Sequence, residues 1–249
     1  MTAHAFKLSG QYYDLIYKNK DYISESNYVN SLIRRFNPNA LNILEFGCGT
    51  GKHAKILAGE GFVIHGVDKS VEMVKEANTS DCFTSEVGDI SIDKIFGSFD
   101  VVLALFHVVS YQCSNNAVIA TFRNAYQNLE EGGIFIFDVW YSPAVYSIKP
   151  EARLKKLEDH NLQIIRFADP VIHPNSNIVD VRYTINVHNL FSEVLHSFEE
   201  SHLMRHFSIP EISMLAHFTG FQIMLVEQWL TGKVPSEETW GVCFVLQKK

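Results

Sequence analysis

A glycine-rich turn is the segment of this sequence best suited to chemistry. Three glycines stand at alternate positions after a short apolar run: Gly47, Gly49 and Gly51. Glycine lets the backbone turn sharply and lets a ligand approach main-chain N–H groups with no Cβ in the way. Asp68 ends a second apolar run, where its carboxylate can accept both hydroxyls of a ribose, and Asp89 with Ile90 ends a third, where they can flank an adenine. A lone turn of this kind can be an ordinary strand–helix connection, but the three strand ends together predict a nucleoside site.

The residues around the turn distinguish between nucleosides. The dinucleotide fingerprint G-x-G-x-x-G requires a small residue at Lys52, whereas this chain reads E-x-G-x-G-x-G from Glu45. A Walker phosphate loop requires Ser or Thr after the lysine, and His53 stands there. The chain also lacks the second large substrate domain that many dehydrogenases carry. We therefore expect S-adenosylmethionine (SAM) rather than ATP or NAD(P).

Alternating strands and helices must position these residues. Predicted strands cover residues 42–46, 62–67, 82–86, 99–105 and 133–139, and predicted helices cover residues 52–59, 70–78 and 115–129. Residues 1–40 read as a helical lid, most clearly from residue 22 or 24 to residue 36. Apolar strands that alternate with amphipathic helices indicate a doubly wound, mainly parallel sheet covered on both faces.

The alternation stops after Pro143. Residues 151–208 contain β-like segments without clear helices, and Val179 to Val187 alternate with polar residues as in a half-exposed antiparallel strand. A helix at 210–219 and two final strands, 221–230 and 239–247, follow. We therefore predict a seven-stranded Rossmann-like α/β core from residues 41–150 and 209–249, with an antiparallel β insertion at 151–208 after the fifth strand.

Composition excludes several classes of protein. The 249 residues are 47% hydrophobic and carry a formal net charge of −7, with no extended basic cluster, so nucleic acid is not the expected ligand. Four dispersed cysteines give no sign of a disulfide framework or a zinc knuckle. The N-terminal residues lack an apolar signal core, and the longest apolar stretch is shorter than the ~20 residues that a membrane span requires. We expect a cytoplasmic protein without a membrane partner.

The motifs resemble those of class I SAM-dependent methyltransferases. ILEFGCGTGKHA is similar to the family's first motif, HGVDKSVEM to its second, GDI to its third and FDVVLALFHVVSYQ to its fourth, while LEEGGIFIFDVW matches the fifth-strand region. A closer but looser similarity is to nucleotide-amino-sugar N-methyltransferases. It rests on YYDLIYKNKDY, FHVVSYQ, FDVWYSP and HLMRHF.

This resemblance implies a set of cofactor contacts. The glycines would approach the methionine part of SAM, the two aspartates would hold ribose and adenine, and tyrosines of the lid would close over the cofactor or reach its carboxylate. The implied positions are Tyr13, Tyr17, Tyr22, Glu45, Gly47, Gly49, Gly51, Asp68, Lys69, Met73, Asp89, Ile90, Leu105 and Phe106. No metal is expected.

The reaction would be an in-line displacement at a sulfonium, so the protein must align the acceptor and exclude water. A base is needed only to take a proton from an amine or hydroxyl. His107 and Asp138 end the fourth and fifth predicted strands, where ligands bind in open α/β sheets. We expect one of them to be the base, with Tyr13 beside them, although a loop contact for His107 or a structural salt bridge for Asp138 remains an alternative. The family commonly has Glu at Asp138 and small residues at 107–108.

Acceptor contacts are expected from Tyr111, Trp140, Tyr141, His202 and Arg205. His202 and His206 do not predict a zinc site, because strand positions four apart lie ~13 Å from each other. The favoured function is methylation of an amine or hydroxyl on a nucleotide-linked amino sugar. Methylation of another small metabolite, or a catalytically silent SAM- or nucleotide-binding subunit, stays open. The insertion would cover the acceptor or form a homodimer contact.

Overall fold

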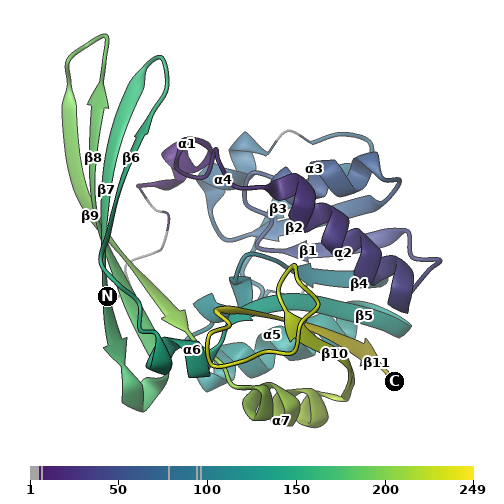
Figure 1. Ribbon diagram of the computed structural model, residues 1–249. Helices are drawn as coiled ribbons and strands as arrows, with labels where there is room; N and C mark the ends of the chain where they lie inside the picture. Colours follow the sequence, from purple (N-terminus) through teal and green to yellow (C-terminus); the bar gives the residue numbers. More distant parts are fainter. Residues whose placement is uncertain (1–5, 7, 78, 94, 96) are drawn as a thin grey trace.

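Two β-sheets make up the framework of the protein (Figure 1). The computed structural model describes residues 6, 8–77, 79–93, 95 and 97–249. The larger sheet has seven strands in the order β10-β11-β5-β4-β1-β2-β3. Its strands are β1 (Asn42–Phe46), β2 (Val63–Asp68), β3 (Phe83–Val87), β4 (Phe99–Ala104), β5 (Leu129–Trp140), β10 (Phe221–Gln228) and β11 (Gly241–Lys248). Strands β1 to β5 pair in parallel and β11 runs antiparallel to β5 and β10, which confirms the predicted core.

Helices cover both faces of this sheet. They are α2 (Tyr22–Phe36), α3 (Lys52–Gly59), α4 (Val71–Glu76), α5 (Asn115–Asn128) and α7 (Ile209–Thr219). The short helix α6 (Ser142–Ser147) follows β5 and packs Val145 against the second sheet. Side chains of Asp21, Ser70, Ser114 and Ser208 accept hydrogen bonds from backbone N–H groups at the starts of α2, α4, α5 and α7. Such caps satisfy N–H groups that have no partner within the helix. The helix predicted for 70–78 ends at Glu76, and residue 78 lies outside the described residues.

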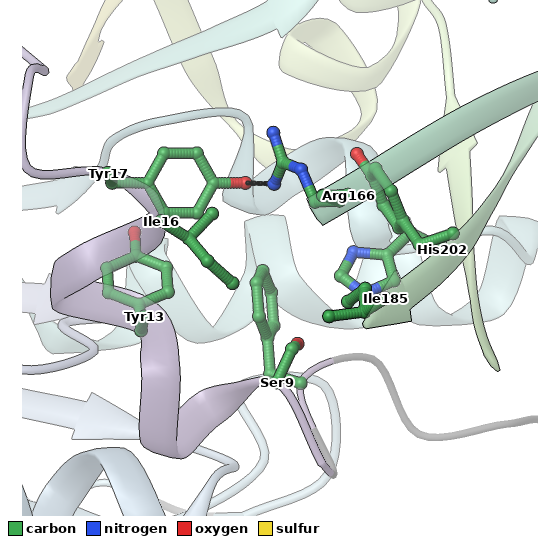
Figure 2. Close-up of a pocket in the computed structure, with 9 residues that line it drawn as sticks. Ser9, Tyr13, Ile16, Tyr17, Arg166, Ile185 and His202 are labelled. Atoms are coloured by element: carbon green, nitrogen blue, oxygen red, sulfur yellow. Dashed lines mark hydrogen bonds between the residues drawn. The ribbon is translucent and has the colours of Figure 1, made fainter. Parts of the chain in front are cut away.

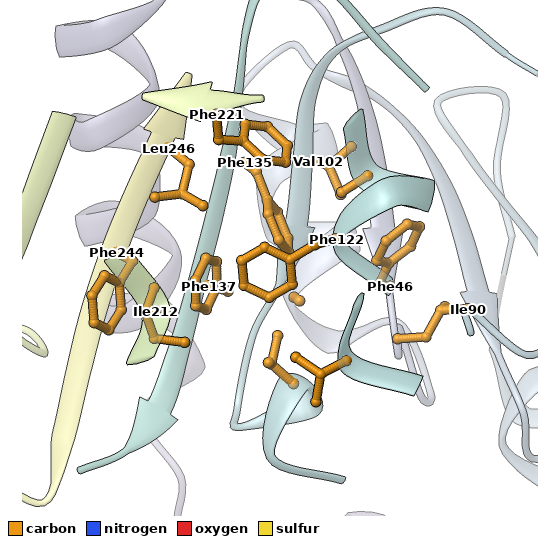
Figure 3. Packing of buried hydrophobic residues seen from close by; sticks show 14 of the residues in the cluster. Phe46, Ile90, Val102, Phe122, Phe135, Phe137, Ile212, Phe221, Phe244 and Leu246 are labelled. Carbon is orange, nitrogen blue, oxygen red and sulfur yellow. The ribbon is translucent and has the colours of Figure 1, made fainter. Parts of the chain in front are cut away.

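Neighbouring strand residues point into two separate hydrophobic layers. Ile43 and Val101 pack with residues of α2 and α3, whereas Leu44 and Val102 pack with residues of α5 and α7. Figure 3 shows the second layer, where Phe122 of α5 meets Phe135 and Phe137 of β5. Because both faces of the strands are buried, the predicted continuous apolar runs are what a doubly wound sheet requires.

The second sheet stands beside the α/β unit as a four-stranded antiparallel layer (Figure 1). It contains β6 (Arg153–Glu158), β7 (Leu162–His173), β8 (Ile178–Asn189) and β9 (Leu195–Arg205), with the short turn η3 (Pro174–Ser176) between β7 and β8. Val179, Val181, Ile185 and Val187 are buried, as the alternation predicted. Strand β6 was not predicted from the sequence, because its residues RLKKLE have no alternating apolar pattern. The strand forms by pairing with β7.

The N-terminal residues divide between the two sheets. The turn η1 (Gly10–Tyr12) and helix α1 (Tyr13–Ile16) lie between the second sheet and α4 (Figure 1). Helix α2 instead buries Val29 and Ile33 in the α/β core. The lid predicted for 1–40 therefore spans two different environments, and residues 1–5 and 7 of it lie outside the described residues. Within the described chain, no helix combines the length and the apolar character needed to cross a membrane.

Candidate functional site

The glycine turn follows β1 and has left-handed backbone at all three glycines, with φ between +55° and +74°. A Cβ on Gly47 would stand 2.4 Å from Val108, and a Cβ on Gly51 would stand 2.4 Å from Phe83. A Cβ on Gly49 would meet only the sulfur of Met73, at 3.6 Å. A side chain at Gly47 or Gly51 would therefore clash with the protein itself, whereas a Cβ at Gly49 would make only an ordinary van der Waals contact with Met73.

Two aspartates hold the neighbouring strand ends together. Asp68, at the end of β2, accepts hydrogen bonds from the backbone N–H groups of Gly49 and Ser70, each at 2.8 Å. Burial raises the pKa of Asp68, and these backbone bonds only partly offset the effect. Asp89, after β3, pairs with Lys69 at 2.7 Å. Burial acts to raise the pKa of Asp89, but bonds from Lys69 and Ser91 outweigh it and hold the pKa below its ordinary value.

The predicted apolar neighbours lie close to these strand ends. Met73 and Ile90 are both buried, and Ile90 belongs to the hydrophobic layer beneath α5. Leu105 is buried in the opposite layer, and Phe106 follows it with φ at +61°. The structure thus gathers the turn, both aspartates and the predicted apolar contacts along one edge of the sheet.

Glu45 places a carboxylate inside the protein next to the turn. It is 2% exposed, and burial together with the charge of Asp68 raises its pKa to about 8. Its Oε2 has no hydrogen-bond partner among the described residues, and Oε1 lies 3.9 Å from Nδ1 of His53. The opposite ring nitrogen of His53 contacts Glu25 at 2.7 Å. A buried carboxylate oxygen without a partner is suited to receive a cationic group from a ligand.

The N-terminal tyrosines are held over this edge by polar anchors. Asp14 of α1 accepts a bond from Thr50 at 2.9 Å and pairs with Lys52 at 2.7 Å, which ties α1 to the glycine turn. Tyr13 lies 4.7 Å from Tyr17 between ring centroids, and Tyr17 lies 5.2 Å from Phe106. Burial raises the pKa of Tyr13 well above its ordinary value.

Tyr22 starts helix α2 and packs edge-on against His53, with ring centroids 5.0 Å apart. Burial raises its pKa to about 12, so its phenol stays protonated at neutral pH. Lys20, just before it, pairs with Glu25 and lies 4.2 Å above the ring of Phe106. The predicted lid tyrosines therefore share the edge of the sheet with the glycine turn.

The two predicted base candidates contact each other. Nδ1 of His107 lies 2.6 Å from Oδ2 of Asp138, and the backbone N–H of His107 donates to Oδ1 at 3.2 Å. Asp138 is 1% exposed near the end of β5, while the His107 side chain is 23% exposed. Burial would raise the pKa of Asp138, but His107 outweighs it and holds the pKa below its ordinary value. Asp138 thus fixes the orientation of the imidazole, and Nε2 remains the ring nitrogen available for proton transfer.

The turn that carries His107 is strained. Phe106 and His107 both adopt left-handed backbone, with φ of +61° and +64°, immediately before the turn η2 (Val108–Tyr111). Such a conformation is uncommon for side chains larger than glycine and is often found at functional sites. Trp140, at the end of β5, lies 6.0 Å from the imidazole and the same distance from Trp240. The histidine is therefore presented between aromatic side chains.

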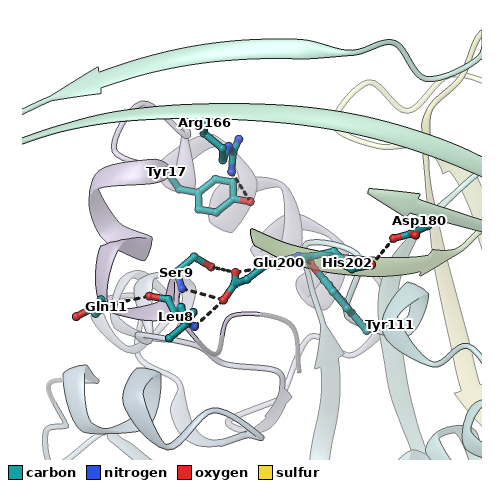
Figure 4. Close-up of polar contacts among 10 residues, drawn as sticks. Leu8, Ser9, Gln11, Tyr17, Tyr111, Arg166, Asp180, Glu200 and His202 are labelled. Carbon is teal, nitrogen blue, oxygen red and sulfur yellow. Dashed lines mark hydrogen bonds and ion pairs between the residues drawn. The ribbon is translucent and has the colours of Figure 1, made fainter. Parts of the chain in front are cut away.

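The predicted acceptor residues divide into two groups. Tyr111 and His202 are hydrogen-bonded at 3.1 Å, and Glu200 beside them accepts bonds from Leu8 and Ser9 (Figure 4). Burial acts to raise the pKa of Glu200, but bonds from His202 and Ser9 lower it to about 2. This network anchors the N-terminal segment to β9.

Arg205 and the adjoining residues face another part of the molecule. Arg205 pairs with Glu211 of α7 at 2.5 Å, and Tyr141 bridges to Phe207 where the insertion rejoins the core. His206 bonds to Ser142 at 2.8 Å, away from the partners of His202. Among the described residues no cluster of three metal-ligating side chains occurs.

Several contacts at this edge were not predicted from the sequence. They are made by Asp14, Glu25, His53, Arg166 and Glu200. The H-x-x-x-H spacing drew attention to His202, but the acid two residues before it carried no motif. Arg166 and Glu200 each stand on an otherwise apolar strand face. Charged residues are seldom buried without a partner, so this position was the signal that could have identified them.

The chain is similar to known methyltransferases. The family described as a methyltransferase domain matches residues 22–226. "Putative methyltransferase YqeM" of Bacillus subtilis (strain 168) is 27% identical over 218 residues, which is 85% of each chain. The dTDP-3-amino-3,4,6-trideoxy-alpha-D-glucopyranose N,N-dimethyltransferase of Streptomyces venezuelae is 28% identical over 138 residues, covering 54% of this chain and 58% of that protein. The crystal structure of Streptomyces venezuelae DesVI superposes with a TM-score of 0.80 at 22% identity, covering 95% of this chain and 97% of that one.

Proposed function

Because this chain belongs to the methyltransferase-domain family, we propose that it transfers a methyl group from SAM to the amine of a nucleotide-linked amino sugar. The observation that carries the proposal is the His107–Asp138 pair, which lies at the ends of adjacent parallel strands and on the same edge as the glycine turn. The edge formed by the carboxyl ends of the strands is where open α/β sheets bind ligands.

The residues around the turn fit a bound SAM. The missing side chain at Gly49 lets a ligand approach the main chain, and Asp68 and Asp89 supply acceptors for ribose and adenine. The free Oε2 of Glu45 suits an ammonium group. SAM supplies an electrophilic methyl group on a sulfonium. Tyr13, Tyr17 and Phe106 form an aromatic cover that keeps water from that edge.

His107 acts as the base in this proposal. Contact between Nδ1 and Asp138 directs Nε2 toward the acceptor, where it takes a proton from the ammonium form of the acceptor and frees the nitrogen lone pair. Asp138 positions the ring and stabilises the imidazolium after the proton is taken. The free amine would then attack the methyl carbon in line with the C–S bond, which breaks as SAH leaves, and Trp140 and Tyr111 border the path of the amine.

The sugar acceptor rests on the named relatives, since Streptomyces dimethyltransferases act on dTDP-amino sugars. The second sheet would cover this acceptor.

The outer face of the second sheet exposes apolar side chains, with Leu154 opposite Phe167 and Ile165 two residues before Phe167. We propose that this face joins two copies of the chain as a homodimer. All four cysteines are free thiols, and we place the protein in the reducing cytoplasm.

Calorimetric titration with S-adenosylhomocysteine (SAH) tests the cofactor, with NAD⁺ and ATP as controls. Micromolar binding of SAH alone supports the proposal, and a folded protein that binds none contradicts it. Methyl transfer to a panel of dTDP-amino sugars then tests the acceptor. His107→Ala and Asp138→Ala should abolish turnover without changing SAH affinity, whereas His217→Ala on the exposed face of α7 should leave both unchanged. Binding of SAH without turnover on any amino sugar would favour another metabolite or a silent subunit.

A further inference from the structure

Arg166 is a buried arginine that forms no ion pair with an acidic side chain of the described residues. It lies on β7, is 9% exposed, and donates to the hydroxyl of Tyr17 at 3.4 Å (Figure 2). Its guanidinium lies 4.9 Å from the ring of Tyr183 and 5.4 Å from the ring of Tyr17. None of the ion pairs found within the described part of the chain includes it. Buried arginines are nearly always paired with an anion, so this one has capacity for a ligand.

The surroundings of Arg166 are positively charged. Lys155 is its register partner on β6, and Arg153 lies two residues earlier on the same face. Burial and the charges of Arg166 and Arg153 lower the pKa of Lys155. Glu200 lies on the same face of the sheet, opposite Tyr183, but its carboxylate is already bonded to Ser9 and His202.

Asp14 is the acid of the adjoining helix α1. Thr50 and Lys52 hold its carboxylate at the glycine turn. The acids on the elements packed around Arg166 are thus engaged elsewhere, and the positive charge on this face of the second sheet remains available to an external anion.

This face opens toward the proposed reaction edge. Arg166 lines a small cavity together with Tyr13, Tyr17, Tyr183 and His202 (Figure 2). The ring of Tyr17 lies between Arg166 and Phe106, 5.2 Å from the latter. The guanidinium is therefore one aromatic ring away from the strand end at which His107 stands.

We propose that Arg166 binds the diphosphate of the nucleotide-linked acceptor, an inference that rests on the proposed function. A guanidinium presents parallel N–H donors that match two phosphate oxygens, and few residues bind a dianion as well from a partly buried position. The cavity has room for about one water molecule. A diphosphate is larger than this space, so its binding requires Tyr17 to give up the hydrogen bond to Arg166.

Titrations with three probes test this inference: SAH, inorganic pyrophosphate and dTDP. Arg166→Gln should weaken pyrophosphate and dTDP binding about 10- to 100-fold, the effect of losing charge-assisted hydrogen bonds, and leave SAH affinity unchanged. Arg166→Lys keeps the charge but loses the paired N–H donors of the guanidinium, so its affinity for pyrophosphate and dTDP should lie between those of the wild type and Arg166→Gln. Arg182→Gln, on the exposed opposite face of β8, is the matched control and should bind all three probes normally. Unchanged SAH affinity also shows that the variant is folded.

Each alternative outcome has a distinct meaning. If Arg166→Gln binds dTDP and pyrophosphate as the wild type does, Arg166 is not the anion site and the proposed function is untouched. If it loses SAH affinity instead, the guanidinium serves the carboxylate of the cofactor and the inference is wrong. If the wild type binds pyrophosphate through Arg166 but does not bind dTDP, the anion site stands and the nucleotide-linked acceptor fails. If the wild type binds neither pyrophosphate nor dTDP, the inference fails, while SAH binding still decides the proposal for the cofactor.

Discussion

The substitutions Gly51→Ala and Gly49→Ala separate the packing role of the glycine turn from its binding role. Left-handed backbone costs a residue with a side chain roughly 1–2 kcal/mol, and this cost applies to both sites. At Gly51 the new methyl would stand 2.4 Å from the fully buried ring of Phe83. Overpacking of that kind adds roughly 1–3 kcal/mol. At Gly49 the nearest atom is 3.6 Å away, so no overpacking arises.

Gly51→Ala should therefore lower the free energy of unfolding by roughly 2–5 kcal/mol and Gly49→Ala by only about 1–2 kcal/mol. SAH affinity should show the reverse order among folded variants. The methyl at Gly49 enters the space assigned to the cofactor and should weaken SAH about tenfold or more, which is about 1.4 kcal/mol.

Urea unfolding and calorimetric SAH titration measure the two effects. Gly59→Ala is the matched control, because Gly59 lies in α3, where an added Cβ would meet no atom within 4 Å, and should gain about 0.5–1 kcal/mol in helical stability. Equal losses of stability at Gly49 and Gly51 would refute the steric argument. Unchanged SAH affinity in Gly49→Ala would refute the placement of the cofactor.

Three further outcomes are expected. Asp138→Asn should cost about 3–5 kcal/mol at pH 7 in urea unfolding, since it breaks a buried pair with His107. Because the folded-state pKa of Asp138 is lowered, its stabilisation is present above about pH 4 and is lost as the pH falls further, so persistence of the full difference in acid would contradict the pairing. Because the folded-state pKa of Glu45 is raised, the wild type should lose on the order of a few kcal/mol of stability as the pH rises from about 4.3 through about 8. Glu45→Gln should lack this loss, and parallel stability curves for the two proteins would contradict the raised pKa of Glu45. Phe167→Glu should convert a dimer to monomer in sedimentation, unlike Phe218→Glu on α7, and an unchanged mass would remove the outer sheet face as the interface.

The sequence predicted features that depend on local pattern and on strand order. Buried strands are recognisable as apolar runs in the sequence, so β1, β4 and β5 were predicted within a few residues of their observed bounds. The glycines lie at the three positions of the turn where the backbone is left-handed. His107 and Asp138 were placed at adjacent strand ends, and the structure adds that they contact each other.

Features set by distant pairing could not be predicted in this way. Strand β6 has a charged, irregular sequence and forms because β7 supplies its hydrogen-bond partners. Arg166 meets Tyr17 across 149 residues, and no local pattern reports that contact. The direction of Arg205 is set by its ion pair with Glu211 in a helix that follows it, and no local pattern reports that contact.

The chain enters and leaves the second sheet at neighbouring points of the core. Trp140 accepts a backbone bond from Phe207, and Ser142 donates one back to it, so the chain leaves the core and returns to it at neighbouring residues. The enclosed segment is then a closed loop, whose length affects core stability only by about 0.6 kcal/mol per doubling. The sequence of the segment between Ser142 and Phe207 can therefore change while the glycine turn and the His107–Asp138 pair stay in place. Under the proposed function, residues of the second sheet that face the acceptor can change in this way, while the glycine turn and the His107–Asp138 pair, which lie outside the inserted segment, are retained.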